Sequence, residues 1–344
     1  MPAFLIIEPE PLNNHKSGRG ARGRNLELFL REYYGASSVS TIGMKKLTDA
    51  RSYRVDHLFI GIPSSITRKD LKRVSFRKLH LFDYGDNEKV NWGHSDKEFL
   101  CTMTASYLKP WTQKNWGDEF NWGTLPIRRN KALYLCVKVN NLFKGIGETP
   151  NKRTIDTTFL GNPVVRWKEN YGRRTESTRI HWLNEISSCS RFSFSGGFFM
   201  RDQEAEMLRE NADELLKPLF LKKGRINFVS YFRLMLNAKT ALTPPGNALW
   251  SYRHYEAIYA GAIPVSADFR EAEMLVPLPK NGMVHVGSGE SVLPSLEQAI
   301  KIRKDNPKLP AQNFEYLEQY MSNGLYDCRK RLLLERFMKQ IEKD

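Results

Sequence analysis

Short apolar segments alternate with amphipathic helical segments along this chain, and that alternation limits the folds it can adopt. Ala3–Ile7, Asp56–Pro63 and Lys78–Phe82 have the composition of buried strands. Between the first two, residues 26–33 repeat apolar side chains at helical spacing. Strands separated by helices form βαβ units, so this part of the chain predicts a mainly parallel sheet.

A second series of the same kind follows. Its strands are predicted at Thr157–Gly161, Thr240–Thr243 and Ile263–Val265, and its helices include Thr175–Ser187 and Ser251–Ala260. At about 100–200 residues per domain, a chain of 344 residues fits two domains. The sequence therefore predicts an α/β fold made of two Rossmann-like domains in tandem.

The boundary between these domains is predicted from composition. Asn140–Thr154 is rich in Gly, Asn and Lys, which is typical of a linker. We therefore expect an amino-terminal domain over residues 1–153, a second domain over 154–320, and a helix over 321–344 that packs back across the domains. Three further elements are predicted locally: a helix at Thr67–Val74, a strand at Ala132–Val139, and helix along Phe314–Lys343.

The chain carries a large positive charge. It has 53 Lys and Arg against 38 Asp and Glu, which gives a formal net charge of +15. Such a charge attracts polyanions, and nucleic acid, anionic membrane and phosphorylated small molecules all qualify. With 41% hydrophobic residues the chain can form real cores, which excludes wholesale disorder.

No apolar run approaches the roughly 20 residues that a bilayer-spanning helix needs. The first residues lack both a basic start and an apolar stretch long enough for a signal peptide, so we expect a soluble, cytoplasmic protein. The four cysteines lie far apart with no CxxC pair, which indicates neither a zinc cage nor a dense disulfide framework.

One segment carries most of the chemical information. Residues 242–265 read as a strand, a Pro/Gly/Asn loop that contains Gly246 and Asn247, a helix that starts at Ser251, and another strand. This order places a helix N-terminus at the carboxyl end of a parallel sheet, where free N–H groups and the helix dipole favour a diphosphate. Arg253 offers a planar fork for phosphate oxygens, and Glu256, one turn further, can accept both hydroxyls of a ribose. Taken singly, these residues read equally well as a helix cap and surface charges.

The run Pro244-x-Gly246-Asn247-x-x-Trp250-Ser251-x-Arg253-x-x-Glu256-Ala257-x-x-x-Gly261-x-Ile263-Pro264-Val265 resembles the donor-binding signature of exostosin-like glycosyltransferases. The resemblance covers residues 228–266 and implies a GT-B fold, with two Rossmann-like domains facing a cleft. It also implies transfer of a sugar, which we expect to come from a UDP-sugar with inversion. Gly161, followed by Arg174 and Arg179, is similar to the start of that family's donor domain, where arginines approach the diphosphate. The animal members carry a membrane anchor, so this chain resembles a soluble bacterial or viral-type relative.

Transfer of this kind needs stabilisation of the leaving phosphates and a base for the acceptor hydroxyl. The sequence has no DxD motif after a donor-domain strand, so we expect no metal and no cofactor, with Arg174, Arg179 and Arg253 in place of a metal. Asp83 and then Asp86, just beyond a strand end, are the first candidates for the base, although either can simply stabilise a turn. Other acid or histidine candidates are Glu8, Glu10, His15 and Asp56.

Two other functions stay open on the sequence. Gly18, Gly20 and Gly23 form a GxGxxG pattern between a strand and a helix, which would suit an NAD(P)-dependent oxidoreductase, although the motif alone is weak evidence. The net charge would also suit a nucleic-acid-binding protein, but no recognition helix or zinc knuckle accompanies it. We therefore expect a nucleotide sugar donor and a glycan acceptor as partners, and no nucleic acid.

Overall fold

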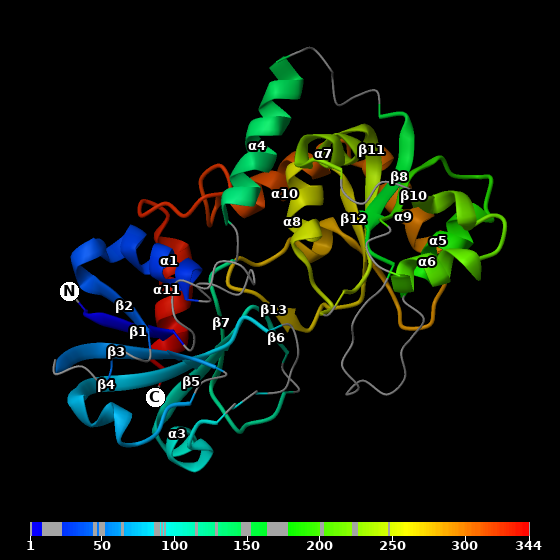
Figure 1. Ribbon diagram of the computed structural model, residues 1–344. Helices are drawn as coiled ribbons and strands as arrows, with labels where there is room; N and C mark the ends of the chain where they lie inside the picture. Colours follow the sequence, from blue (N-terminus) through cyan, green and yellow to red (C-terminus); the bar gives the residue numbers. More distant parts are fainter. Residues whose placement is uncertain are drawn as a thin grey trace. The chain divides into compact units, whose positions relative to one another are not determined.

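The computed structural model describes residues 2–8, 23–43, 47, 52–62, 65–85, 90, 92, 94–113, 116–127, 130–145, 153–163, 178–199, 203–221, 226–246 and 248–343. The chain forms two compact units. The first comprises residues 1–130, 271–277 and 319–344, and the second comprises 131–270 and 278–318. Each unit is built on its own six-stranded sheet, and the strands of the two expected series lie within these sheets (Figure 1).

The sheet of the first unit has the order β2-β1-β3-β4-β5-β7, and all of its neighbouring strands are parallel. The strands are β1 (Phe4–Glu8), β2 (Val39–Gly43), β3 (Tyr53–Gly61), β4 (Val74–Phe82), β5 (Thr104–Lys109) and β7 (Trp122–Thr124). The helices of this unit are α1 (Arg24–Tyr34), α3 (Lys97–Met103) and α11 (Arg331–Ile341). A two-stranded antiparallel pair joins β6 (Thr112–Gln113) to β13 (Ala272–Glu273). Buried Leu, Ile and Val side chains on the central strands form the core of this unit.

The sheet of the second unit has the order β10-β9-β8-β11-β12-β14 and is also parallel throughout. Its strands are β8 (Ile155–Gly161), β9 (Phe194–Phe199), β10 (Phe220–Leu221), β11 (Ala238–Thr243), β12 (Ile263–Ala267) and β14 (Val284–Val286). Its helices are α4 (Asn130–Gly145), α5 (Thr178–Ser187), α6 (Gln203–Glu210), α7 (Phe228–Asn237), α8 (Tyr252–Tyr259), α9 (Val292–Asp305) and α10 (Leu309–Glu318). Helices therefore alternate with the strands, as in a doubly wound α/β unit.

Helix α8 shows how the sequence fixes the ends of one of these elements. Ser251 is its N-cap residue, and Gly261 follows its C-terminus with a φ of 68°. The Ala262 N–H donates to the Ala257 carbonyl at 2.9 Å and the Gly261 N–H donates to the Ile258 carbonyl at 2.8 Å, which is the Schellman pattern. Because glycine adopts positive φ at little cost, the chain can leave the helix here and enter β12.

Three local predictions are wrong. Residues 132–139 do not form a strand, because they lie in α4, which runs to Gly145. Leu133, Cys136, Val137 and Asn140 are buried at helical spacing, a period that the β-branched and apolar composition concealed. At residues 67–74 the structure has a short 3-10 turn at Asp70–Arg73 and then β4.

The third wrong prediction is the continuous helix along residues 314–343. The segment divides into α10 and α11, because Asn323 and Gly324 take positive φ values of 51° and 72°. A left-handed pair of residues cannot continue a right-handed helix. Within the described residues, no helix combines the length and the apolar character that crossing a bilayer requires.

Candidate functional site: the switch point of the second sheet

The order of strands in the second unit identifies one edge as the place to look for a ligand. Chain order runs outward from β8 to β9 and β10 on one side, and from β11 to β12 and β14 on the other. The switch point therefore lies between β8 and β11, which are hydrogen-bonded neighbours. In open α/β sheets, ligands bind beyond the carboxyl ends of the strands at such a point. Gly161 ends β8 here, and the loop after Thr243 of β11 leads to α8.

Arg179, in the first turn of α5, reaches this switch point. Its Nε donates to the Pro245 carbonyl at 3.1 Å, and its Nη1 donates to the Asn162 carbonyl at 2.7 Å. The guanidinium thus joins the loop after β8 to the loop after β11. Burial, and then the nearby positive charge of Arg253, lower the pKa of Arg179 to about 9.

Arg253, in the first turn of α8, lies beside it. Its Nη2 donates to the Leu160 carbonyl at 2.8 Å, and its Cζ lies 4.6 Å from the centre of the Phe159 ring. The ring face attracts the cation and fixes the plane of the guanidinium. Leu160 is the penultimate residue of β8, so Arg253 is fixed at the carboxyl end of this strand.

Neither arginine of this pair has an ion pair with an acid in the part of the chain that the structure describes. Carbonyl oxygens accept their hydrogen bonds but do not cancel their charge. Two neighbouring cations in a partly desolvated place repel one another, and the pKa of Arg179 is lowered first by burial and then by this repulsion. An anion with several oxygens bound here would relieve this repulsion and could accept hydrogen bonds from the planar guanidinium groups.

Two glycines make room for this pair. A methyl group at Gly161 would lie 2.9 Å from Nη2 of Arg253 and 2.8 Å from the Phe159 ring. A methyl group at Gly246 would lie 2.9 Å from Nη2 of Arg179. Both distances are below ordinary van der Waals contact, so any larger residue would displace a guanidinium.

The start of α8 is held in place by a buried histidine. Nδ1 of His254 accepts from the Ser251 N–H at 3.0 Å, and its Nε2 lies 2.8 Å from Oγ of Ser266 at the end of β12. Burial lowers the pKa of His254 to about 3, so the ring is neutral. Nδ1 also lies 2.9 Å from the carbonyl oxygen of Ser251. The ring therefore ties the first turn of α8, which carries Arg253, to the sheet.

Glu256 lies one turn into α8 and has a partner that its sequence position did not reveal. Oη of Tyr231, on α7, donates to Oε2 of Glu256 at 2.6 Å, and Tyr231 also hydrogen-bonds Arg253. Burial and the carboxylate raise the pKa of Tyr231 well above its usual value, so the phenol keeps its proton and remains a donor. The carboxylate is thereby oriented while keeping capacity for further hydrogen bonds.

The candidate acids of the first unit are held differently. Asp83 follows β4 and is only 5% exposed. Its Oδ2 lies 3.2 Å from Nζ of Lys109, which is fully buried, and its Oδ1 accepts from the Gly85 N–H. Glu8 is buried and accepts from the Gly23 N–H. Asp56 accepts from the Ala3 N–H at 2.7 Å.

Several predicted positions fall outside the described residues. They are Asp86, Arg174 and Asn247, with Glu10, His15, Gly18 and Gly20 among the alternatives. Of the predicted donor-site residues that are described, the structure brings together Gly161, Arg179, Gly246, Ser251, Arg253 and Glu256 at one edge of the second sheet. The sequence reasoning missed Tyr231, His254 and Phe159. Only His254 had a local signal, because it stands three residues after the serine cap, where a capping-box partner belongs.

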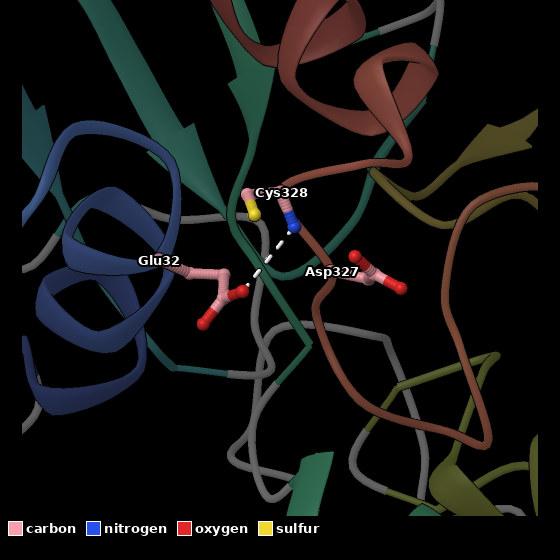
Figure 2. A group of neighbouring side chains, drawn as sticks. All are labelled: Glu32, Asp327 and Cys328. Atoms are coloured by element: carbon pink, nitrogen blue, oxygen red, sulfur yellow. Dashed lines mark hydrogen bonds between the residues drawn. The ribbon is translucent and has the colours of Figure 1, made fainter.

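One group of potential metal ligands occurs among the described side chains, in the first unit (Figure 2). Glu32, Asp327 and Cys328 offer ligand atoms within 4.8 Å of one another. Both oxygens of Asp327 are bound by the guanidinium of Arg329, with Nη2 at 2.6 Å from Oδ2, and Ser322 donates to Oδ2 as well. This carboxylate is therefore committed to protein donors, and the Glu32 carboxylate binds the Cys328 N–H at 3.2 Å. The group reads as a helix-to-loop tether rather than as a metal centre.

No family model and no curated protein matches the sequence. Solved structures do match. An alpha-glucosyltransferase in complex with UDP and a 13-mer DNA has a TM-score of 0.52 at 11% identity, with 100% of both chains covered. The UDP-forming alpha,alpha-trehalose-phosphate synthase from Burkholderia vietnamiensis has a TM-score of 0.52 at 9% identity, covering 99% of this chain and 98% of that one. HepE of Anabaena in complex with UDP has a TM-score of 0.50 at 12% identity, with 99% of each chain covered.

At these identities the likeness concerns the fold. The two parallel six-stranded sheets match GT-B glycosyltransferase structures along essentially the whole chain, which confirms the fold expected from the sequence.

Proposed function

We propose that this protein is a glycosyltransferase that moves a sugar from a nucleotide diphosphate sugar, specifically a UDP-sugar, to a hydroxyl group of a glycan. The observation that carries the proposal is the pair Arg179 and Arg253, which has no acidic ion-pair partner among the described residues, at the switch point of the second sheet. Two of the structural neighbours were solved with UDP. A diphosphate supplies negative charge and several oxygens that both guanidinium groups could bind.

The chemistry proposed for this edge is stabilisation of the leaving group. When the bond between the anomeric carbon and the diphosphate breaks, negative charge grows on the phosphate oxygens. Preorganised donors at that position lower the barrier, because they need no reorientation during the reaction. Arg179, Arg253 and the N-terminus of α8 are such donors, and we propose that they act without a metal and that Arg174 joins them.

Glu256 is proposed to bind the nucleoside. Its carboxylate, oriented by Tyr231, would accept hydrogen bonds from the ribose hydroxyls. Gly246, Asn247 and Ser251 would let the backbone of the loop approach the diphosphate. The finer assignment to the exostosin-like family rests on the motif between Pro244 and Val265 and belongs to this proposal.

The base is proposed to come from the first unit, with inversion at the anomeric carbon. Asp83 is the first candidate and Asp86 the second. Asp83 is already bound to Lys109, which orients it, and it is little exposed. Removing a general base lowers a rate by about 100- to 10,000-fold.

The test begins with binding. Calorimetry with UDP and with a panel of nucleotide sugars is expected to show micromolar binding of one uridine-containing donor. Glu256→Ala is expected to weaken UDP about tenfold, the loss of a charge-assisted hydrogen bond. Glu297→Ala, an exposed acid on α9, is the matched control and should leave the affinity unchanged. UDP affinity that is the same in Glu256→Ala would reject the ribose contact, and tight NAD binding without UDP binding would reject the proposed function.

The acceptor is tested separately. The favoured donor is incubated with glycans and, because the net charge is +15 and one neighbour was solved with DNA, also with duplex DNA. We expect transfer to a glycan. A labelled sugar recovered on DNA instead would keep the reaction type and change the acceptor.

A further inference from the structure

A cavity lies in the second unit, away from the switch point. Its volume is about 360 Å³, and it is lined by the end of α8, by Arg153 before β8, by Arg303 of α9 and by parts of α4 and α10. Arg153 precedes β8, and Arg303 contacts carbonyls at the starts of β11 and β12. The cavity is therefore at the amino ends of the strands, whereas the arginine pair of the donor edge is at their carboxyl ends.

Among the described residues, the two arginines of this cavity bind backbone carbonyls and no side chain. Nη1 of Arg153 donates to the carbonyls of Met235 and Ala238, at 2.9 and 2.6 Å, and its Nη2 donates to that of Ala260 at 2.6 Å. Nη1 of Arg303 donates to the carbonyl of Gly261 at 2.6 Å. These contacts satisfy the last carbonyls of α7 and α8, as cations at helix C-termini do.

Capping of helix ends does not account for the whole arrangement. One cation per helix end is enough, yet here two approach each other, and neither has an ion pair with an acid within the described ranges. Burial and the charge of Arg303 lower the pKa of Arg153 to about 9, and burial lowers that of Arg303. In addition, Nε and Nη2 of Arg303 have no hydrogen-bond partner among the described residues, which leaves one side of its fork available.

The remaining walls of the cavity are mainly apolar. Ile258, Pro310 and Phe314 line it, and the Phe314 ring is fixed edge-on against Tyr259 with centroids 5.5 Å apart. The single acid in the lining, Glu315, is exposed. A volume near the lower end of small-molecule sites combined with apolar walls and two cations suits a small amphipathic anion.

We propose that this cavity is a second ligand site, which binds a small organic phosphate monoester. Its dianionic phosphate meets Arg303 and Arg153, and its carbon body lies on Phe314 and Pro310. Two adjacent guanidiniums match the two charges of a phosphate monoester better than the single charge of a carboxylate. The site is independent of the proposed glycosyl transfer, because it uses none of the residues of the donor edge.

The experiment is a calorimetric titration with phenyl phosphate on the full chain saturated with UDP, so that the donor edge is already filled. Binding is expected to be about tenfold tighter than that of inorganic phosphate, because the ring buries apolar surface, and tighter than that of benzoate. The titration is repeated without UDP on the Arg179→Gln variant, whose donor edge has lost one of its two cations. The cavity is therefore still tested if UDP does not bind to this protein at all.

Variants decide whether the cavity is the place of binding. Arg303→Gln is expected to weaken phenyl phosphate at least tenfold, and Arg303→Lys, which keeps the charge but loses the fork, several-fold. Lys304→Gln removes the same charge from an exposed neighbouring position on α9 and should change nothing. Thermal melting of each variant confirms that it folds. Equal affinity of Arg303→Gln and the unchanged protein, or no binding of phenyl phosphate above the level of inorganic phosphate, would overturn the proposal.

Discussion

The two sheets of this protein share one topology and differ in the chemistry at their carboxyl ends. In both, six parallel strands are arranged around a switch point, β1 with β3 in the first unit and β8 with β11 in the second. In the first unit the two described acids that we considered at this end are bound by protein donors: Asp83 by Lys109 and Gly85, and Glu8 by Gly23. In the second unit this end carries Arg179 and Arg253, which bind carbonyls and form no ion pair among the described side chains, and Glu256, which binds Tyr231.

The difference indicates at which sheet edge a charged ligand would bind. A buried ion pair that is complete within the protein gains nothing from a ligand and loses much if one partner is removed. Two cations held close together without an acid gain from any polyanion that fits. The same fold can therefore present a closed edge, here the carboxyl end of the first sheet, and a receptive edge, here that of the second sheet. Side chains rather than strand order decide which edge is closed and which is receptive.

The largest effect, on stability, is expected when the Asp83–Lys109 ion pair of the closed edge is broken. Asp83→Asn leaves Lys109 charged, buried and without its partner, which costs about 3–5 kcal/mol of unfolding free energy. The double change Asp83→Leu with Lys109→Met removes both charges and is expected to restore most of that stability. Thermal melting measures the first effect, and transfer activity of the stable double variant measures the second.

This pair of variants separates a structural role of Asp83 from a catalytic one. We expect the double variant to lose about 1,000-fold in kcat with UDP affinity unchanged, as the loss of a general base predicts. Full activity in the double variant would assign the base to another acid, and Asp86→Asn is then the change to measure.

The next largest effect concerns the receptive edge. Arg179→Gln removes one of the two cations and the link between the loops after β8 and β11, and we expect UDP to bind about 100-fold more weakly. Arg191→Gln, an exposed arginine of the same unit, is the control with the same loss of charge. If both variants bind UDP equally well, the edge receives its ligand by overall charge and not by the pair.

A smaller effect is expected from crowding the same edge. The methyl group of Gly161→Ala would press on the Arg253 guanidinium and on the Phe159 ring, so a shifted fork should cost about tenfold in UDP affinity. Gly43→Ala is the matched change in open space at the end of β2. An unchanged UDP affinity in Gly161→Ala would show that the position of Arg253 is not critical.

The receptive edge could be predicted in good part from sequence, since its residues follow one another in a single strand, loop and helix. Gly246, Ser251, Arg253 and Glu256 lie within 11 residues, and their order alone places them at the start of α8. The strands that the sequence predicted correctly and helix α5 are likewise local features, set by apolar runs and by helical spacing. A local pattern fails to predict the element where the spacing of apolar residues fits both a strand and a helix, as in α4.

What the sequence could not supply is pairing between distant segments. Tyr231 precedes Glu256 by 25 positions, and Lys109 follows Asp83 by 26, yet each pair is in hydrogen-bond contact. No local spacing encodes such contacts, because they depend on which strands and helices become neighbours. The Asp83 partner matters most, since it turns an apparently available carboxylate into one that is already bound.

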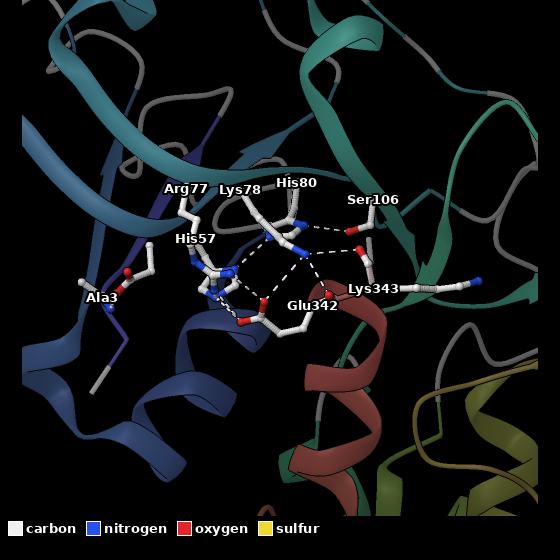
Figure 3. A network of polar contacts seen from close by, with 9 residues as sticks. Ala3, His57, Arg77, Lys78, His80, Ser106, Glu342 and Lys343 are labelled. Carbon is white, nitrogen blue, oxygen red and sulfur yellow. Dashed lines mark hydrogen bonds and ion pairs between the residues drawn. The ribbon is translucent and has the colours of Figure 1, made fainter.

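The last comparison concerns a buried polar network in the first unit (Figure 3). Nδ1 of His57 lies 3.0 Å from Nε2 of His80, whose Nδ1 lies 2.8 Å from Oγ of Ser106. At its other end, Nε2 of His57 lies 3.0 Å from Oε1 of Glu342 and 3.2 Å from Nη2 of Arg77. The network joins β3, β4 and β5 to the residue that follows α11. Like the acids of this unit, its groups are satisfied within the protein.

Burial lowers the pKa values of both His57 and His80, so the folded protein keeps them neutral while the unfolded chain protonates below about pH 6.5. Stability is therefore expected to fall as the pH drops through that value, by about 1.4 kcal/mol per pH unit for each such histidine. Melting temperatures at pH 7.5 and 5.5 measure the fall. His80→Gln should make this fall in melting temperature smaller, by about 2–4 °C for each kcal/mol of pH-dependent stability that the change removes. His181→Gln, at an exposed position on α5, should leave the fall unchanged. An equal fall in His80→Gln and in the unchanged protein would mean that the network opens before the unit unfolds, and that the first unit is less closed than its contacts indicate.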